Sequence, residues 1–246
     1  MTRALTAILY APGTNCHEET AAALERAGVP SELVLLRDLL DGGSSLSGYE
    51  AVVVPGGFSY GDHLGAGRVF ATLLTARLGE QLQEFLAAGK PLLGICNGFQ
   101  VLVEAGVLPV RSPGHRSAAL LENQSGRFED RKVRLLVSRQ ECIWTDGLGS
   151  EVLEMPSAHG EGRPVFQNAA ISAGARVVLS YVDAPGEPTN HYPENPSGAA
   201  GGFAGIADAT GLVLGLMPHP ERASLPAHYS QDGLKLFKNL ARWLHP

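Results

Sequence analysis

The chain has few of the features that mark secreted, membrane-spanning and nucleic-acid-binding proteins. Its 246 residues include only three cysteines, which is too few and an odd number for a disulfide framework. We therefore expect free thiols and a cytoplasmic location. No apolar run reaches the roughly 18 residues of a membrane span. The apolar start at residues 4–11 leads into a polar turn, which favours a buried strand over a signal peptide. The net charge of −6 gives no indication of binding to nucleic acid or to an anionic membrane.

Cofactor motifs are missing as well. The sequence has no phosphate loop of the type G-x-x-x-x-G-K-[ST], and Gly65 and Gly67 lack the third glycine of a dinucleotide fingerprint. No Cys/His cluster has the spacing of a zinc site. Several remaining His and Cys side chains are interpreted as surface residues or inert thiols: His17, His63, His159, Cys16 and Cys142. The sequence therefore predicts no cofactor, no metal and no ATP site in this chain.

The chain does contain the alternation of apolar runs and amphipathic segments that is typical of α/β proteins. Hydrophobic residues make up 44% and charged residues 18%, as in ordinary globular domains. Strands are expected at 4–11, 31–36, 49–54 and 92–95, and helices at 18–27, 61–76, 78–88 and 97–105. This spacing favours a parallel sheet with right-handed crossovers.

The second half of the sequence has a different pattern. Residues 120–138, 163–166 and 177–182 are expected to form an antiparallel extension, and 183–202 a long surface loop. A hairpin at 203–207 and 212–217 and a helix at 232–244 complete the chain. No repeat or linker divides it, so we predict one domain over residues 1–246. The expected fold is three-layer α/β, with a mostly parallel sheet flanked by helices and an antiparallel extension.

The most informative stretch surrounds Cys96. Leu92 to Ile95 form an apolar run, and the segment after Cys96 suits a helix that ends at Gly106. The spacing Gly94-x-Cys96-x-Gly98 is the thiol form of the nucleophile elbow, a sharp strand-to-helix turn whose crowded backbone favours glycine. The turn lifts the sulfur out of the sheet and places it at a helix N-terminus, where the dipole favours the thiolate. The alternative is a buried structural cysteine.

A nucleophilic thiol needs a base and donors for a developing oxyanion. His219 follows an apolar strand between two prolines, and Glu221 at i+2 would face the same side in an extended segment and orient the imidazole. Oxyanion N–H groups are expected from Asn97, next to the nucleophile, and from Gly57 after the strand at 49–54. The alternatives are a surface turn at His219 and Glu221 and an ordinary turn at Gly57.

These residues together carry a family resemblance. The segments around Cys96 and His219 resemble class I glutamine amidotransferases of the triad type, which have a flavodoxin-like fold. Longer stretches resemble, more narrowly, the glutaminase subunits of phosphoribosylformylglycinamidine synthase. These stretches are Pro12–Cys16, Pro55–Asp62, Asn123–Glu129, Ala158–Arg163, Tyr192–Pro196 and Gly215–Arg222. The resemblance covers nearly the whole chain, and the motifs are specific jointly rather than singly.

The resemblance implies a role for each matching residue. Cys96 would attack the side-chain amide of glutamine, His219 would move the proton, and Glu221 would orient His219, with Gly57 and Asn97 as oxyanion donors. Further glutamine contacts are implied for Gln100, Ser125, Gly126 and Phe128. The ammonia would pass to a separate synthetase subunit that binds ATP and formylglycinamide ribonucleotide, and a small third subunit would complete the complex in de novo purine synthesis.

Two departures and two alternatives remain. Similar proteins usually carry arginine near Gly65 and at Ser180, so contacts with the synthetase are expected to differ here. The alternative enzyme is a stress-response hydrolase or deglycase with a cysteine elbow, a class that lacks the late His-x-Glu. The alternative of another class is a non-catalytic subunit that only scaffolds the synthetase.

Overall fold

A large mixed sheet organises the molecule. The computed structural model describes residues 4–138, 141–184 and 186–245. Within these residues the sheet has nine strands in the order β2-β1-β3-β4-β11-β10-β9-β6-β7. Its parallel half consists of β2 (Ser31–Leu35), β1 (Thr6–Tyr10), β3 (Ala51–Val54), β4 (Leu92–Ile95) and β11 (Val213–Leu216). Its antiparallel half consists of β10 (Phe203–Ala207), β9 (Arg176–Tyr181), β6 (Glu129–Val137) and β7 (Val152–His159).

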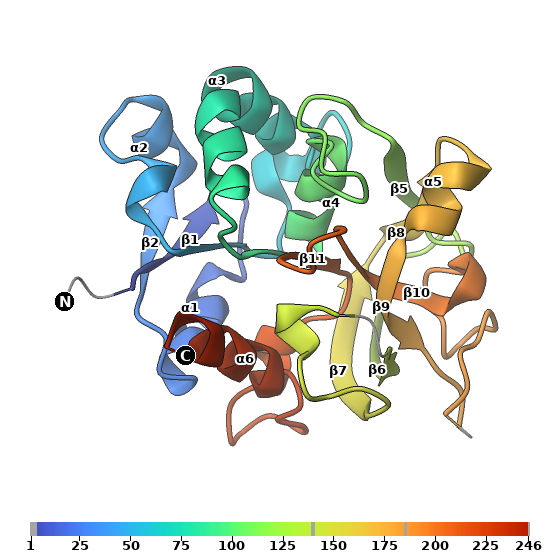
Figure 1. Ribbon diagram of the computed structural model, residues 1–246. Coiled ribbons are helices and arrows are strands. Elements are labelled where there is room, and N and C mark those ends of the chain that lie inside the picture. Colours follow the sequence, from blue (N-terminus) through green and yellow to red (C-terminus); the bar gives the residue numbers. More distant parts are fainter. Residues whose placement is uncertain (1–3, 139–140, 185, 246) are drawn as a thin grey trace.

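Helices cover both faces of this sheet (Figure 1). One face carries α2 (Leu36–Leu40), α3 (Arg68–Ala87) and α4 (Asn97–Glu104), and the other carries α1 (His17–Arg26) and α6 (Leu234–Leu244). The short helix α5 (Ala169–Gly174) and a separate ribbon of β5 (Ala118–Glu122) and β8 (Glu161–Phe166) lie beside the antiparallel half. The predicted three-layer α/β fold with an antiparallel extension is confirmed.

The central parallel strands are apolar because both of their faces are covered. Every residue of β3, β4 and β11 is buried, as their continuous runs of Val, Leu and Ile predict. Connections that run from strand to helix and on to a parallel strand bring the carboxyl ends of β3, β4 and β11 to one edge of the sheet, where α/β proteins place their ligands.

Strand β7 was not predicted, and its sequence explains why. It contains Pro156, which argues against a central strand because proline donates no ladder hydrogen bond. β7 lies at the edge of the sheet, where one side of the strand needs no donor. The free Pro156 carbonyl accepts a bond from the backbone N–H of His219 at 2.8 Å, so this edge supports a candidate catalytic residue.

Other expectations need smaller corrections. The two helices expected at 61–76 and 78–88 form the single helix α3, which begins only at Arg68. The non-helical φ of −121° at Leu78 marks the border between the two expected helices. The strand expected at 163–166 pairs with β5 and not with the main sheet. The loop at 183–202, of which residue 185 lies outside the described residues, is partly buried: Asn195 Nδ2 donates to the carbonyls of Thr189 and Ala199. Among the described residues, no helix is long and apolar enough to span a membrane.

Candidate active site

Cys96 occupies a sharp turn between β4 and α4. Its φ is +49°, a left-handed value that non-glycine residues rarely adopt. The neighbouring glycines are required by close packing, since a Cβ on Gly98 would lie 1.9 Å from the carbonyl oxygen of Val54 and one on Gly94 would lie 2.7 Å from that of Gly98. The predicted elbow is therefore confirmed. The Cys96 thiol donates a long hydrogen bond of 3.5 Å to the carbonyl of Ala158 and lines a cavity.

His219 and Glu221 form a buried pair after β11. The His219 Nδ1–H donates to Glu221 Oε1 at 2.5 Å, and the two residues are 2% and 0% exposed. The segment is a short 3-10 helix (Pro220–Ala223) rather than the expected extended strand, and it still brings the two side chains together. The Nδ1 bond fixes the tautomer, which leaves Nε2 with no partner in the described part of the chain.

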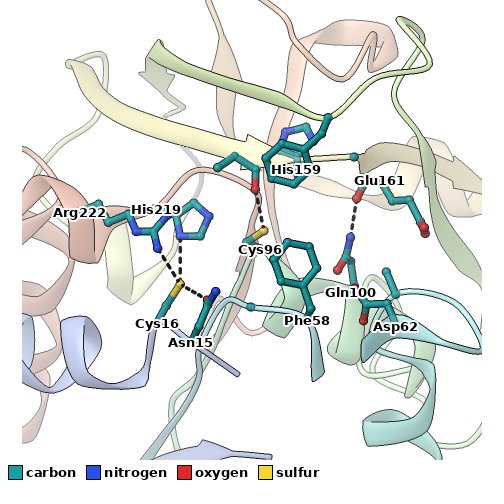
Figure 2. A pocket seen from close by; sticks show the side chains of 15 residues that line it. Asn15, Cys16, Phe58, Asp62, Cys96, Gln100, His159, Glu161, His219 and Arg222 are labelled. Carbon is teal, nitrogen blue, oxygen red and sulfur yellow. Dashed lines mark hydrogen bonds between the residues drawn. The ribbon is translucent and has the colours of Figure 1, made fainter. Parts of the chain in front are cut away.

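The electrostatics of this pair suit a proton carrier. Burial lowers the pKa of His219, but the charges of Glu221 and Cys96 raise it by more than burial lowers it. The pKa of His219 therefore lies well above its ordinary value. Cys96 and His219 both line the same cavity (Figure 2). Two segments that are far apart in the sequence thus supply a thiol on one side, and an imidazole with its carboxylate on the other, to one place.

Two backbone N–H groups, those of Gly57 and Asn97, are the candidate oxyanion donors. Gly57 has φ of +142° and lines the cavity, and a Cβ there would lie 2.6 Å from the backbone N of Asn15, so glycine is needed. Asn97 begins α4, and its side chain fixes this region: Oδ1 accepts from the Ser59 N–H at 3.1 Å, and Nδ2 donates to Gln100 Oε1 at 3.0 Å. Within the described residues, neither the Gly57 nor the Asn97 backbone N–H donates to another group.

The cavity around Cys96 is small, about 150 Å³. Of the four predicted glutamine contacts, Gln100 and Phe128 line it, and Ser125 and Gly126 do not. Ser125 lines a neighbouring cavity of about 360 Å³ instead. The loop that carries these two residues points them to the surface, where both are exposed.

The buried side chain of His159 corrects the expectation of a surface residue. It is 2% exposed and lines the cavity, and its Nδ1–H donates to Asn123 Oδ1 at 2.9 Å. Burial lowers the pKa of His159 to about 3, assisted by the nearby His219. His159 lies within the motif Ala158–Arg163, which the sequence singled out without giving this residue a role.

Cys16 also corrects an expectation, because it is not remote from the site. Its sulfur lies 4.0 Å from His219 Nδ1, and Arg222 Nη2 donates to it at 3.3 Å. Burial raises the pKa of the Cys16 thiol, partly offset by the contact with His219. All three cysteines are free, as predicted, and all three are buried. No local pattern links Cys16 to His219, which is why the sequence did not place it.

Two carboxylates line the other end of the cavity. Asp62 Oδ1 accepts from Asn97 Nδ2 at 3.1 Å, and the backbone carbonyl of Glu161 accepts from Gln100 Nε2 at 2.6 Å. Burial raises the pKa of both carboxyl groups, and for Glu161 the charge of Asp62 adds to the effect. The cavity therefore joins the Cys96 thiol and the His219 imidazole to an acidic end at Asp62 and Glu161 (Figure 2).

Comparisons with known proteins agree with this geometry. The CobB/CobQ-like glutamine amidotransferase domain matches residues 3–244. Phosphoribosylformylglycinamidine synthase subunit PurQ of Dehalococcoides mccartyi is 41% identical over 254 residues, covering 99% of this chain and 98% of the relative. The same subunit of Pyrococcus furiosus is 41% identical, with 97% of both chains covered.

Comparison with solved structures shows the same fold. A chain in the structure of PurLQS from Thermotoga maritima superposes with a TM-score of 0.81 and 33% identity, over 99% of this chain and 100% of that one. A glutamine amidotransferase of Thermotoga maritima, at 16% identity and a TM-score of 0.61, shares the fold.

Proposed function

The chain belongs to the PurQ family of phosphoribosylformylglycinamidine synthase subunits, which carry a CobB/CobQ-like glutamine amidotransferase domain, and from this premise we propose how its residues act. It is the glutaminase subunit of that synthase: it hydrolyses glutamine to glutamate and ammonia for the ATP-dependent step of de novo purine synthesis that converts formylglycinamide ribonucleotide to formylglycinamidine ribonucleotide. The observation that supports our assignment of roles is the buried His219–Glu221 pair beside the strained elbow of Cys96.

In the first half of the reaction the Cys96 thiolate attacks the side-chain amide carbon of glutamine. The carbonyl oxygen becomes an oxyanion, which the N–H groups of Gly57 and Asn97 stabilise, each contributing about 3 kcal/mol. The His219 imidazolium gives its Nε2 proton to the amide nitrogen, the C–N bond breaks, and ammonia leaves with a glutamyl thioester on Cys96. Glu221 holds Nδ1–H throughout and stabilises the imidazolium.

In the second half water hydrolyses the thioester. His219 Nε2 takes a proton from the attacking water, the oxyanion forms again at the same donors, and the C–S bond breaks to release glutamate and the Cys96 thiolate. Gln100 and Phe128 contact the substrate in this proposal, since both line the cavity. Ser125 and Gly126 were predicted in the same role, and neither lines this cavity, so this proposal assigns them no contact there.

We propose that the ammonia passes to a separate ATP-binding synthetase subunit and that a small third subunit completes the assembly. The likeness to a chain in the structure of PurLQS from Thermotoga maritima supports this composition. Near Gly65, where similar proteins carry arginine, the guanidinium of Arg68 lies within contact distance of a Cβ built on the glycine, and the Arg68 side chain is about half exposed. We also propose that the protein is cytoplasmic, which its three free thiols support, and that residues 1–246 act as one domain.

The test uses the assembled complex and Cys96→Ala. We expect loss of glutamine-dependent synthesis and retention of synthesis from added ammonia, because the variant removes only the nucleophile. Cys142→Ala is the matched control, a buried cysteine that does not line the Cys96 cavity, and should retain both activities. Unchanged use of glutamine by Cys96→Ala would show that the subunit is a scaffold.

A second measurement separates the two thiols of the cavity. A diazo-ketone analogue of glutamine should label Cys96 and leave Cys16 unlabelled, as read by mass spectrometry of peptides. Labelling of Cys16 instead would show that the assignment of the nucleophile to Cys96 is wrong. The isolated chain should show weak glutaminase activity, since hydrolysis without an acceptor wastes glutamine.

A further inference from the structure

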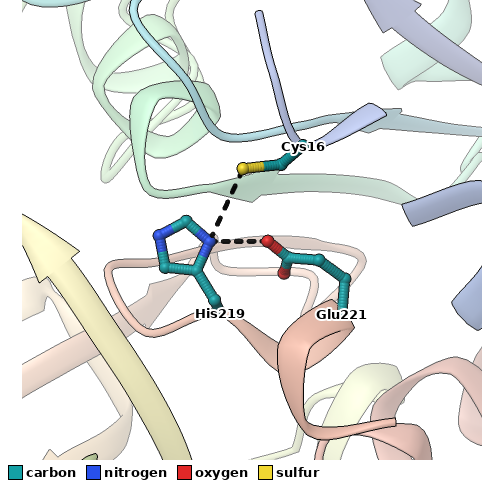
Figure 3. A group of neighbouring side chains, drawn as sticks. All are labelled: Cys16, His219 and Glu221. Carbon is teal, nitrogen blue, oxygen red and sulfur yellow. Dashed lines mark hydrogen bonds and ion pairs between the residues drawn. The ribbon is translucent and has the colours of Figure 1, made fainter. Parts of the chain in front are cut away.

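Cys16 is a buried thiol that the proposed reaction does not use, yet it lies against the residues that do. Its sulfur, His219 Nδ1 and a carboxylate oxygen of Glu221 all lie within 4.8 Å of one another (Figure 3). The three residues come from the start of α1 and from the segment after β11, and all are buried. Cys96 is not a member of this group.

The donor set is one that zinc-type cations prefer. A tetrahedral zinc ion with S, N and O ligands at about 2.3, 2.0 and 2.0 Å places those ligand atoms about 3.3–3.6 Å apart. The present separations are 4.0 Å between Cys16 Sγ and His219 Nδ1 and 2.5 Å between Nδ1 and Glu221 Oε1. Shifts of less than 1 Å in these two pairs would bring them to the required values, and the Cys16 sulfur lies within 4.8 Å of the Glu221 oxygen.

A second observation is an unsatisfied oxygen at the same place. Glu221 Oε2 is buried and has no hydrogen-bond partner among the described residues, although Glu221 is 0% exposed. A buried carboxylate oxygen without a donor is costly, and a cation would satisfy it. Arg222 Nη2 already donates to the Cys16 sulfur, and such a bond would stabilise a metal-bound thiolate from outside the ligand shell.

The site also has an approach. Glycine at position 56 keeps a side chain away from the ligands, because a Cβ there would lie 2.8 Å from His219 Cε1 and 3.2 Å from Cys16 Sγ. Cys16 and His219 both line the cavity that contains Cys96, which supplies a path for a hydrated ion and an open fourth position for water.

We propose that Cys16, His219 and Glu221 form an inhibitory site for a zinc-type divalent cation. On binding, the thiol proton of Cys16 and the Nδ1 proton of His219 pass to solvent, and the metal takes the place of the Nδ1–H bond to Glu221. The imidazole can then no longer form the imidazolium that delivers a proton to the leaving ammonia. Inhibition, but not metal binding, rests on the function proposed above.

Binding is tested with Co²⁺ on the full chain, because a cobalt–thiolate bond gives a sulfur-to-metal charge-transfer band in the near ultraviolet. Wild type, Cys96→Ala and Cys142→Ser should all show the band. Cys16→Ser should lose it and bind cobalt more than about tenfold more weakly. Cys16→Ala serves as a second variant, with circular dichroism to establish folding. A band that survives in Cys16→Ser and disappears in Cys96→Ala would place the metal on the nucleophile and overturn the proposal.

Inhibition is tested with Zn²⁺ on the assembled complex. Glutamine-dependent synthesis should fall with added zinc and recover with a chelator, while ammonia-dependent synthesis stays constant. Each variant is compared with its own zinc-free activity, and Cys16→Ser should be more than about tenfold less sensitive than wild type. Equal sensitivity of the two would overturn the inhibitory role. If Cys96→Ala still used glutamine, the proposed function would fail, and the cobalt spectrum would still report the site.

Discussion

His159 should make the protein sensitive to mild acid. Asn123 Nδ2 donates to the carbonyls of Arg127 and His159, so its amide is fixed with Oδ1 toward the ring and can only accept the Nδ1–H. The remaining nitrogen, Nε2, is buried without a partner within the described residues, so protonation there places an unpaired charge in the interior.

The size of the effect follows from linkage. A depressed pKa in the folded state means that the unfolded chain binds more protons, so stability is lost as the pH falls below the unfolded value of about 6.5. With a folded pKa of about 3, the loss between about pH 7 and about pH 5 is about 2 kcal/mol, and the full shift corresponds to about 5 kcal/mol.

The assay is urea unfolding at the two pH values, followed by circular dichroism. His159→Gln keeps a donor for Asn123 and removes the titrating group, so its free energy of unfolding should fall by about 2 kcal/mol less than that of wild type between about pH 7 and about pH 5. His63→Gln, at an exposed position, should behave as wild type. An identical loss in wild type and His159→Gln would refute the reasoning.

Three further predictions concern the elbow and the pair that faces it. Glu221→Gln should lower kcat for glutamine. Because its partner His219 has a raised pKa, the variant should also lose stability, most below about pH 6.5 and less as the pH rises. Unfolding curves of wild type and variant at each pH measure this loss. Gly98→Ala should destabilise by about 3 kcal/mol or more, because its Cβ would meet a backbone oxygen. Gly79→Ala, within α3, should stabilise by about 0.5–1 kcal/mol, because no atom lies within 4 Å of a Cβ there. Thermal melts that rank the two variants the other way would contradict the packing argument. Asn97→Ala should reduce glutaminase kcat more than it raises KM, because it frees the loop that carries Gly57; a change confined to KM would count against that role.

Local sequence was enough for the elbow and for the His–Glu pair. The glycines around Cys96 permit a sharp backbone turn that few other residues allow. Glu221 lies close to His219 in the chain whether the segment is extended or helical. The apolar periods likewise predicted the parallel strands and most of the helices, since both faces of those strands had to be covered.

Only the tertiary structure decided what surrounds the sulfur. The sequence did not predict the edge strand β7, which contains Pro156, and His159 at the end of that strand is buried, whereas a surface residue was expected. Cys16 reaches His219 across more than 200 residues of sequence, while Ser125 and Gly126 turn away from the cavity their motif suggested. A local pattern sets backbone angles and periodicity, but burial and partners depend on which distant segments pack together, and those contacts leave no trace in the spacing of the residues.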